Sequence, residues 1–267
     1  MTKQQVREFW DRASCGEIYA EGVGLRDRLE AQAAMRYRLE PYIRGFARFG
    51  EGAGRDVLEV GVGMGADHLE WAKVHPRRLA GVDFSARAVE FTRARLDLHG
   101  AKSSLAVADA ENLPYAAGSF DLVYSWGVLH HTPDTARAVA EVRRVLRAGG
   151  TARIMVYQTH ALVGYLLWLR YGVLAGRPGR GLEDIYAHHL ESPGTRTFTG
   201  EQARELFRGF SHVTARVELS CGDLLEGAAG ERHGGAWLAA ARRLWPRWMI
   251  RRLLRERGLF LLIEAVK

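Results

Sequence analysis

The chain contains little cysteine, no long apolar run and no recognisable leader, and each absence excludes a class of protein. Its two cysteines, Cys15 and Cys221, are far apart in 267 residues and fit no metal-binding spacing. We therefore expect free thiols in a reducing cytoplasm. The longest apolar run, Ala161–Leu169, is about half as long as a bilayer span and ends at Arg170, which excludes a membrane-spanning protein.

Positive charge exceeds negative charge, but the excess is local. The formal net charge is +7, and residues 231–258 hold eight arginines against two glutamates. Within this stretch, residues 237–258 are also rich in tryptophan and leucine. They fit a peripheral helix on a membrane surface, a site for an anionic acceptor or nucleic acid, or a capping helix pair interrupted at Pro246 with solvated arginines. The last interpretation is favoured, because helix faces are commonly charged.

The most informative stretch is Asp56–Ala66, DVLEVGVGMGA. A short apolar strand leads into Gly61, Gly63 and Gly65, and a helical run begins near Asp67. Such a turn lets the backbone approach a ligand and directs helix N–H groups towards it. The spacing also satisfies a dinucleotide-binding fingerprint, but Glu59, inside the strand, has little use in a pyrophosphate-binding turn.

Strands and helices alternate after this turn, which predicts right-handed crossovers and a parallel sheet in one sizeable core. Acidic residues follow two of the strands, so Asp83 and Asp109 are expected at neighbouring strand tips, where ligands gather. Their alternative role is to form strand-end turns. The expected strands are 56–60, 79–82, 104–108, 120–125, 152–157, 213–219 and 259–266. The expected helices between them are 67–75, 86–99 and 134–147, the last ended by Gly149 and Gly150.

Flanking segments are also expected to be helical. We predict helices over 3–13 and 26–49, the second kinked at Pro41, and over 160–174 and 182–190. Thr199 and Gln202 predict a capping box for a helix through Phe207.

Four motifs, VLEVGVGMG, GVD, VADAENLPYAAGSFDLVYSWGVLHH and RVLRAGG, cover residues 55–157. With them the chain resembles the class I S-adenosylmethionine-dependent methyltransferases, above all the small-molecule branch that includes the ubiquinone and menaquinone C-methyltransferases. One departure is Ala148, where the family usually has proline. The resemblance implies a Rossmann-like α/β fold with a seven-stranded, mostly parallel sheet, helices on both faces, and the last strand antiparallel between the fifth and sixth.

The resemblance also implies how S-adenosylmethionine is held. Glu59 and the backbone from Gly61 through Gly63 to Gly65 would bind the methionine end. Asp83 would bind the ribose hydroxyls. The adenine and sulfonium contacts would come from Phe84, from Asp109 with Ala110, and from Ser125 with Trp126.

Residues 1–50 are expected to form an N-terminal helical lid. Residues 51–267 would form the methyltransferase domain, with lid insertions at about 158–198 and 220–258. In the family such helices close the substrate pocket; alternatively they pack on the sheet edge.

Candidate catalytic residues are His130, His131 and Tyr19, and candidate acceptor-binding residues are Tyr157, His160, His188 and His189. Histidine titrates near neutral pH and can act as a base, although the paired histidines also suit the start of the next helix. Adjacent histidines on a helix point about 100° apart, so no metal site is expected.

The sequence thus predicts a cytoplasmic methyltransferase that acts on an O, N or C atom of a small molecule. The alternatives are an RNA or DNA methyltransferase that uses residues 237–258, and a nicotinamide-dependent oxidoreductase. Nucleic acid is disfavoured because SWGVLHH lacks the sequences expected for methylation of bases. The residues do not indicate an oligomeric state.

Overall fold

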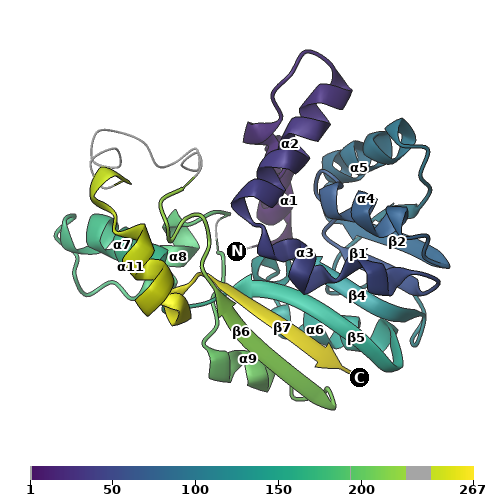
Figure 1. Cartoon of the computed structure of the whole chain (residues 1–267). Helices are drawn as coiled ribbons and strands as arrows, with labels where there is room; N and C mark the ends of the chain where they lie inside the picture. The colour runs from purple at the N-terminus through teal and green to yellow at the C-terminus, as the bar shows by residue number, and fades with distance from the viewer. Residues whose placement is uncertain (1, 193, 227–241) are drawn as a thin grey trace.

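The fold is built on one twisted sheet. The computed structural model describes residues 2–192, 194–226 and 242–267. Its seven strands lie in the order β3-β2-β1-β4-β5-β7-β6, and β7 runs antiparallel to both neighbours (Figure 1). The predicted fold class is confirmed. The strands are β1 (Asp56–Val60), β2 (Arg78–Asp83), β3 (Ser104–Val107), β4 (Phe120–Trp126), β5 (Leu146–Tyr157), β6 (His212–Glu218) and β7 (Phe260–Val266).

Alternate residues of the buried strands enter two separate cores, because side chains along a strand point to opposite faces. Leu58 and Val60 of β1 pack with α6 (Thr135–Val145) and α9 (Gly200–Leu206). Val57 packs on the other face with Trp71 of α4 (Ala66–Lys73) and with α3 (Tyr42–Ala47). The helix α5 (Ala86–Leu98) contacts α4, β2 and β3. Glu59 therefore shares the face of Val57, towards α4.

The N-terminal helices differ from prediction at Pro41. The helix α1 (Lys3–Arg12) begins with a capping box at Thr2. The expected kinked helix is instead two helices, since α2 (Leu25–Leu39) ends before Glu40 and α3 begins after Pro41. Proline cannot donate the hydrogen bond that would continue α2, so the helix stops there. Glu40 is consequently the C-terminal capping residue of α2.

The predicted boundary between α6 and β5 was also wrong. The helix ends at Val145, and β5 begins at Leu146, which is fully buried and pairs with Phe120. Gly149 and Gly150 lie inside the strand at a register irregularity, where Gly149 has a φ of 75° and its N–H donates to the carbonyl of Lys267. Tertiary pairing therefore overrides the helix-ending tendency of paired glycines.

The remaining helical segments form a lobe beside the sheet in Figure 1. They are α7 (Leu162–Trp168), the π-helix η4 (Leu169–Val173), α8 (Leu182–His189) and α11 (Arg247–Leu253). Short turns lie elsewhere along the chain: η1 (Glu17–Tyr19) contacts α2, η2 (Phe49–Gly52) contacts α4, η3 (Leu129–His131) contacts α6, and η5 (Arg255–Arg257) follows α11. The capping box of Thr199 and Gln202 at α9 is confirmed. The prediction for residues 237–258 lies partly outside the described residues.

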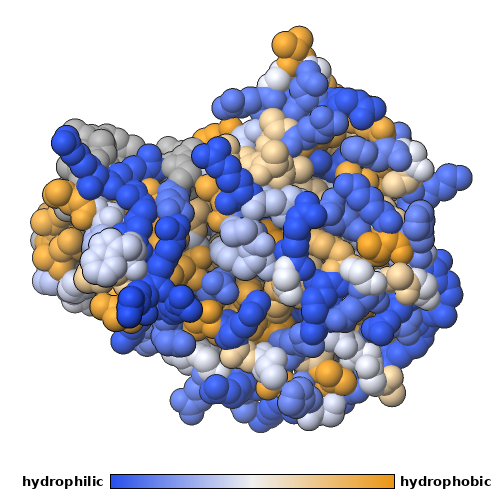
Figure 2. Space-filling model, in the orientation of Figure 1, coloured by the Kyte–Doolittle hydropathy of each residue, from blue (hydrophilic) through white to orange (hydrophobic). Residues whose placement is uncertain are grey.

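The surface of this lobe is mixed. Figure 2 shows hydrophobic side chains on it next to strongly hydrophilic ones. Trp248 is 73% exposed and Leu253 67% exposed. Across the ranges that the structure describes, no helix has the length and apolar character needed to cross a bilayer.

Candidate active site

A cavity of about 510 Å³ opens at the carboxyl ends of the parallel strands. Its wall includes the tip of β1 and the turn after it, the tips of β2, β4 and β5, and residues of α1, α2, α7 and the 190–191 segment. A larger and more open groove between α6 and α9 contains none of the predicted site residues. Because ligands of parallel α/β sheets bind beyond the strand ends, the first cavity is the candidate site.

The turn between β1 and α4 requires glycine. Gly61, Gly63 and Gly65 have φ values of 85°, 52° and 77°. A Cβ atom at Gly61 would lie 2.0 Å from a methyl carbon of Val128, whereas one at Gly63 would meet nothing within 4 Å. Gly63 therefore leaves room for a ligand to approach the backbone.

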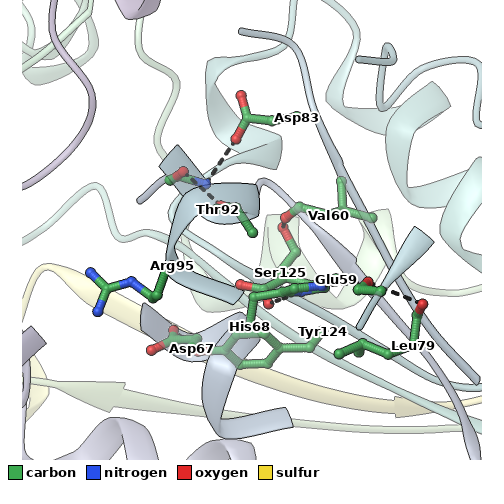
Figure 3. Close-up of polar contacts among 12 residues, drawn as sticks. Glu59, Val60, Asp67, His68, Leu79, Asp83, Thr92, Arg95, Tyr124 and Ser125 are labelled. Carbon is green, nitrogen blue, oxygen red and sulfur yellow. Dashed lines mark hydrogen bonds and ion pairs between the residues drawn. The ribbon is translucent and has the colours of Figure 1, made fainter. Parts of the chain in front are cut away.

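Asp83, at the tip of β2, is bound to this turn. Its Oδ2 accepts a hydrogen bond from the N–H of Gly63 at 3.0 Å (Figure 3). Its Oδ1 accepts one from the N–H of Ser85 at 2.9 Å. Burial raises the pKa of Asp83, although these backbone donors oppose the effect. Each carboxylate oxygen keeps a lone pair, which suits the two hydroxyls of a ribose.

Glu59 lies in a buried hydrogen-bonded chain (Figure 3). Its Oε2 is 2.9 Å from Nδ1 of His68, and Nε2 of His68 is 2.8 Å from Oγ of Ser103. The Ser103 hydroxyl donates its proton to the carbonyl of Leu79, so it accepts from His68 Nε2–H. In a neutral imidazole Nδ1 is then the acceptor, and Glu59 must donate as a carboxylic acid.

The charge states agree with this arrangement. Burial raises the pKa of Glu59 well above its ordinary value, and it lowers the pKa of His68 to about 3. The cavity therefore contains a neutral carboxylic acid at Glu59 in the absence of a ligand.

The N-terminal helix reaches the cavity at the adenine position implied by the resemblance. Lys3 Nζ lies 2.5 Å from Oδ2 of Asp109 and 2.6 Å from Glu111. The guanidinium of Arg7 lies over the ring of Phe84, 4.3 Å from its centroid. Asp109, Ala110 and Phe84 all line the cavity. Helix α1 therefore covers the end of the cavity at which these residues lie.

His131 faces the other end of the cavity. Its Nδ1 is 2.8 Å from Oγ of Ser192 and 3.2 Å from Oγ1 of Thr195. Its Nε2 is 3.4 Å from Oε2 of Glu191 and has no hydrogen-bond partner. The hydroxyl of Tyr157 donates to the same Glu191 oxygen at 2.7 Å. Burial alone would raise the pKa of Glu191, but the nearby His131 ring and the hydrogen bond from Tyr157 oppose it, and the net effect lowers the pKa.

Several predicted residues do not reach this cavity. The hydroxyl of Ser125 is buried and donates to the carbonyl of Val60. His130 is fully buried, and burial holds its pKa well below the ordinary value. The other three are directed elsewhere: His160 bonds Tyr165, His188 bonds the carbonyl of Asp184, and His189 stacks on Tyr171. We therefore remove these five residues from the candidate site, whereas Tyr19, Trp126, His131 and Tyr157 line it.

The structure adds residues that the sequence pattern did not single out for the site. They are Lys3, Trp10, Cys15, Arg36, Glu40, Asp67 and Cys221, all of which line the cavity. Asp67 accepts hydrogen bonds from Arg36, Tyr37 and Tyr124 at 2.6 to 3.0 Å. An acidic residue directly after the glycine turn was the available indication for Asp67. Glu40 gave none, since it comes from a distant segment.

In the parts of the chain that are described, no cluster of His, Cys, Asp and Glu side chains could hold a metal ion. The site instead offers carboxyl groups, one histidine with a free ring nitrogen, and aromatic walls. This composition suits binding of a polar ligand and acid–base chemistry.

Comparison with known proteins supports this picture. Residues 58–154 match the family described as a methyltransferase domain. The chain is 36% identical over 119 residues to a ubiquinone/menaquinone biosynthesis C-methyltransferase from Geotalea uraniireducens, covering 43% of this chain and 50% of the relative. It is 34% identical over 111 residues to methyltransferase GfsG from Streptomyces halstedii, covering 41% and 40%. The chain thus spans about half the length, or less, of these relatives.

A solved structure extends the similarity of fold beyond the matched region. Phospholethanolamine N-methyltransferase 2 from Haemonchus contortus, in complex with S-adenosylhomocysteine, has a TM-score of 0.62 and 17% identity, covering 98% of this chain and 60% of that one. Residues 58–154 are therefore similar to methyltransferase domains, among them those of the ubiquinone and menaquinone C-methyltransferases.

Proposed function

We propose that the protein transfers a methyl group from S-adenosylmethionine to an O, N or C atom of a small molecule. One observation carries the proposal: a single cavity of about 510 Å³ joins the glycine turn and the strand-tip carboxylates to a chamber with aromatic walls. A volume in this range suits a cofactor with part of an acceptor. The domain match to methyltransferases agrees with it.

The proposed cofactor contacts use groups with free hydrogen-bonding capacity. Asp83 would take the ribose hydroxyls, and Gly63 would let the ligand approach the backbone. Glu59 would meet the methionine end. Asp109 and Ala110 would meet the adenine once Lys3 withdraws from Asp109. Glu59 must lose its proton before it can bind the ammonium group of the methionine end as a carboxylate.

S-adenosylmethionine supplies an electrophilic methyl group and a good leaving group, so the chain must mainly position the acceptor and exclude water. Helices α1 and α2 cover the cavity on one side, and α7 with Glu191 covers it on the other. His131 has an unpartnered Nε2 inside the cavity, which can hold a proton from the acceptor.

Isothermal titration calorimetry with S-adenosylhomocysteine and with NAD tests the proposal. We expect saturable binding of S-adenosylhomocysteine and none of NAD at the same concentrations. Glu90→Gln, on the exposed side of α5, is the control and should bind like the unmodified protein. Preferential binding of NAD would overturn the assignment in favour of an oxidoreductase.

A nucleic-acid substrate has weaker support. Two arginines of the basic segment bind within the chain: Arg247 donates to the carbonyl of Leu224, and Arg251 pairs with Glu226 at 2.7 Å. We propose a small-molecule acceptor and a cytoplasmic location, with Cys15 and Cys221 as free thiols. A salt-dependent shift of tRNA or duplex DNA in a gel, caused by binding of the protein, would contradict the small-molecule acceptor.

We also propose that the lobe contacts membranes peripherally. Leu244 is 82% exposed, Trp248 and Leu253 are also exposed, and an arginine precedes each of the three in the sequence. Tryptophan, leucine and arginine together suit an anionic lipid interface. Sedimentation with phosphatidylserine-containing vesicles should recover the full chain, and Trp248→Ser should reduce the bound fraction. Equal recovery of both proteins, or of neither, would contradict this proposal.

A further inference from the structure

The cavity has the opposite charge balance to the whole chain. The protein carries a formal charge of +7. Seven carboxyl side chains line the cavity, against four lysine or arginine side chains: Glu40, Glu59, Asp67, Asp83, Asp109, Glu191 and Glu226 against Lys3, Arg36, Arg170 and Arg242. A cavity of one sign in a protein of the other concentrates ligands of the complementary charge. Because Glu59 is a neutral acid, six carboxyl groups remain to carry negative charge against four cations, and this excess favours a cationic ligand.

Two of these carboxyl groups are left for an acceptor. Glu40, at the end of α2, and Glu191, which accepts a hydrogen bond from Tyr157 at the tip of β5, both line the cavity. Arg36, the nearest cation, makes two hydrogen bonds to Asp67, at 2.6 and 3.0 Å, and remains 3.7 Å from Glu40. The positive charge of Arg36 is thus committed mainly to Asp67.

Aromatic rings surround the same end of the cavity. Trp126 packs on Phe260 with ring centroids 5.6 Å apart, and Tyr157 stacks on Phe260 at 5.9 Å. Trp10 from α1 meets the ring of His131 at 5.3 Å. Aromatic faces together with carboxylates are the usual surroundings of a bound ammonium group.

An unsatisfied nitrogen faces this place. His131 is 4% exposed, and its Nε2 lacks a hydrogen-bond partner while Nδ1 is held by Ser192 and Thr195. A buried polar atom without a partner is costly unless a ligand satisfies it. Nε2 is 3.4 Å from Glu191, so a ligand held by Glu191 lies within reach of it.

We propose that the acceptor is an amine that enters as an ammonium ion, is bound between Glu40 and Glu191, and loses one proton to Nε2 of His131. This inference rests on the proposed methyl transfer. The freed lone pair of the nitrogen then bonds to the methyl carbon, and the electron pair of the carbon–sulfur bond passes to sulfur. The positive charge moves from sulfur to the methylated nitrogen, and His131 returns its proton to solvent.

The raised pKa of Glu40 agrees with a role in binding a cation. Burial raises its pKa to about 7, against the attraction of Arg36 and with the repulsion of Asp67 and Glu191. The other titratable groups that its charge reaches are Cys15, Tyr42, Tyr157 and Cys221. None of these supplies a positive charge, so a bound ammonium is the group that would neutralise Glu40.

Calorimetry on the full chain saturated with S-adenosylhomocysteine tests the inference. The probes are three pairs of nearly equal shape: phenethylamine and 2-phenylethanol, tryptamine and tryptophol, cyclohexylamine and cyclohexanol. At pH 7.5 we expect at least one amine to bind about tenfold more tightly than its alcohol, the lower range for hydrogen bonds to charged groups. No preference in any pair, or no binding of any amine, would overturn the inference.

Variants separate recognition from folding. Glu40→Gln and Glu191→Gln should each lower the affinity for the preferred amine about tenfold, while the alcohol and S-adenosylhomocysteine bind as before. Glu205→Gln, an exposed residue of α9 paired with Arg208, is the matched control and should change nothing. Equal loss of amine and alcohol binding would contradict the role of the carboxylates.

The proton acceptor is tested with the preferred amine and S-adenosylmethionine. His131→Asn should lower turnover, shift the pH profile of kcat, and leave the affinity for S-adenosylhomocysteine unchanged. An unchanged pH profile would remove His131 from the mechanism. Failure of S-adenosylhomocysteine to bind at all would instead refute the proposed function, so the two failures remain distinguishable.

Discussion

Replacement of Glu40 by glutamine should make the protein more stable at alkaline pH. The Glu40 side chain is 16% exposed, follows the last turn of α2, and has its pKa raised from 4.5 to about 7 by burial. The negative end of the α2 dipole also disfavours a carboxylate at this position. Glutamine keeps the shape of the side chain and removes the titration.

The sign and size follow from linkage. Below pH 4.5 the carboxyl is protonated in both the folded and unfolded chain and contributes nothing to the pH dependence. Between pH 4.5 and about 7 the unfolded chain loses its proton first, so folding stability falls, and the loss is complete above the folded pKa. This difference in pKa corresponds to about 3 kcal/mol. The variant should therefore match the unmodified protein near pH 4.5 and exceed it by up to about 3 kcal/mol at pH 8.5.

Urea unfolding followed by tryptophan fluorescence at pH 5, 6, 7 and 8.5 measures this difference. Subtraction of the unmodified protein removes the titration of all other groups. Glu205→Gln, on the exposed surface of α9, should give a flat difference over the same range. A flat or falling difference for Glu40→Gln would refute the reasoning about this carboxyl group.

Three further outcomes are expected. Asp83→Ala should weaken S-adenosylhomocysteine binding by about 1.5–3 kcal/mol in calorimetry, because hydrogen bonds to a charged group are lost; unchanged affinity would remove Asp83 from the site. Asp67→Ala should lower the free energy of unfolding by about 3–5 kcal/mol, since Arg36 loses its closest carboxylate partner and Tyr37 and Tyr124 lose their acceptor, and a loss below 1 kcal/mol in urea would contradict this. Gly61→Ala should abolish S-adenosylhomocysteine binding, because the new Cβ would lie 2.0 Å from Val128; Gly54→Ala, with positive φ but open space, controls for strain alone.

The sequence predicted the glycine turn because the turn depends on a local pattern, whereas the place of the last strand between the fifth and sixth was implied by the family resemblance. The run from Asp56 to Gly65 combines an apolar strand with glycines that only one kind of turn requires. The boundary at Leu146 was not predictable in this way, since its place in β5 depends on pairing with Phe120. Paired glycines near position 150 indicate a helix end equally well.

The acceptor end of the cavity was harder to predict, because its residues come together only in three dimensions. His188 and His189 were chosen for their chemistry, yet both turn away from the cavity, whereas Glu191 two residues later faces it. Glu40 lies at the end of α2, far from His131 and Glu191 in the sequence. No periodicity in the chain links positions 40, 131 and 191.

The hydrogen bond from Gly63 to Asp83 has a consequence for how this site varies. The carboxylate of Asp83, at the end of β2, also holds the loop after β1, so the position of the loop depends on the position of the carboxylate. Substitutions at positions 63 and 83 should therefore show strong non-additivity in a double-mutant cycle. A lineage that changed either residue would have to change the other to keep the loop in place.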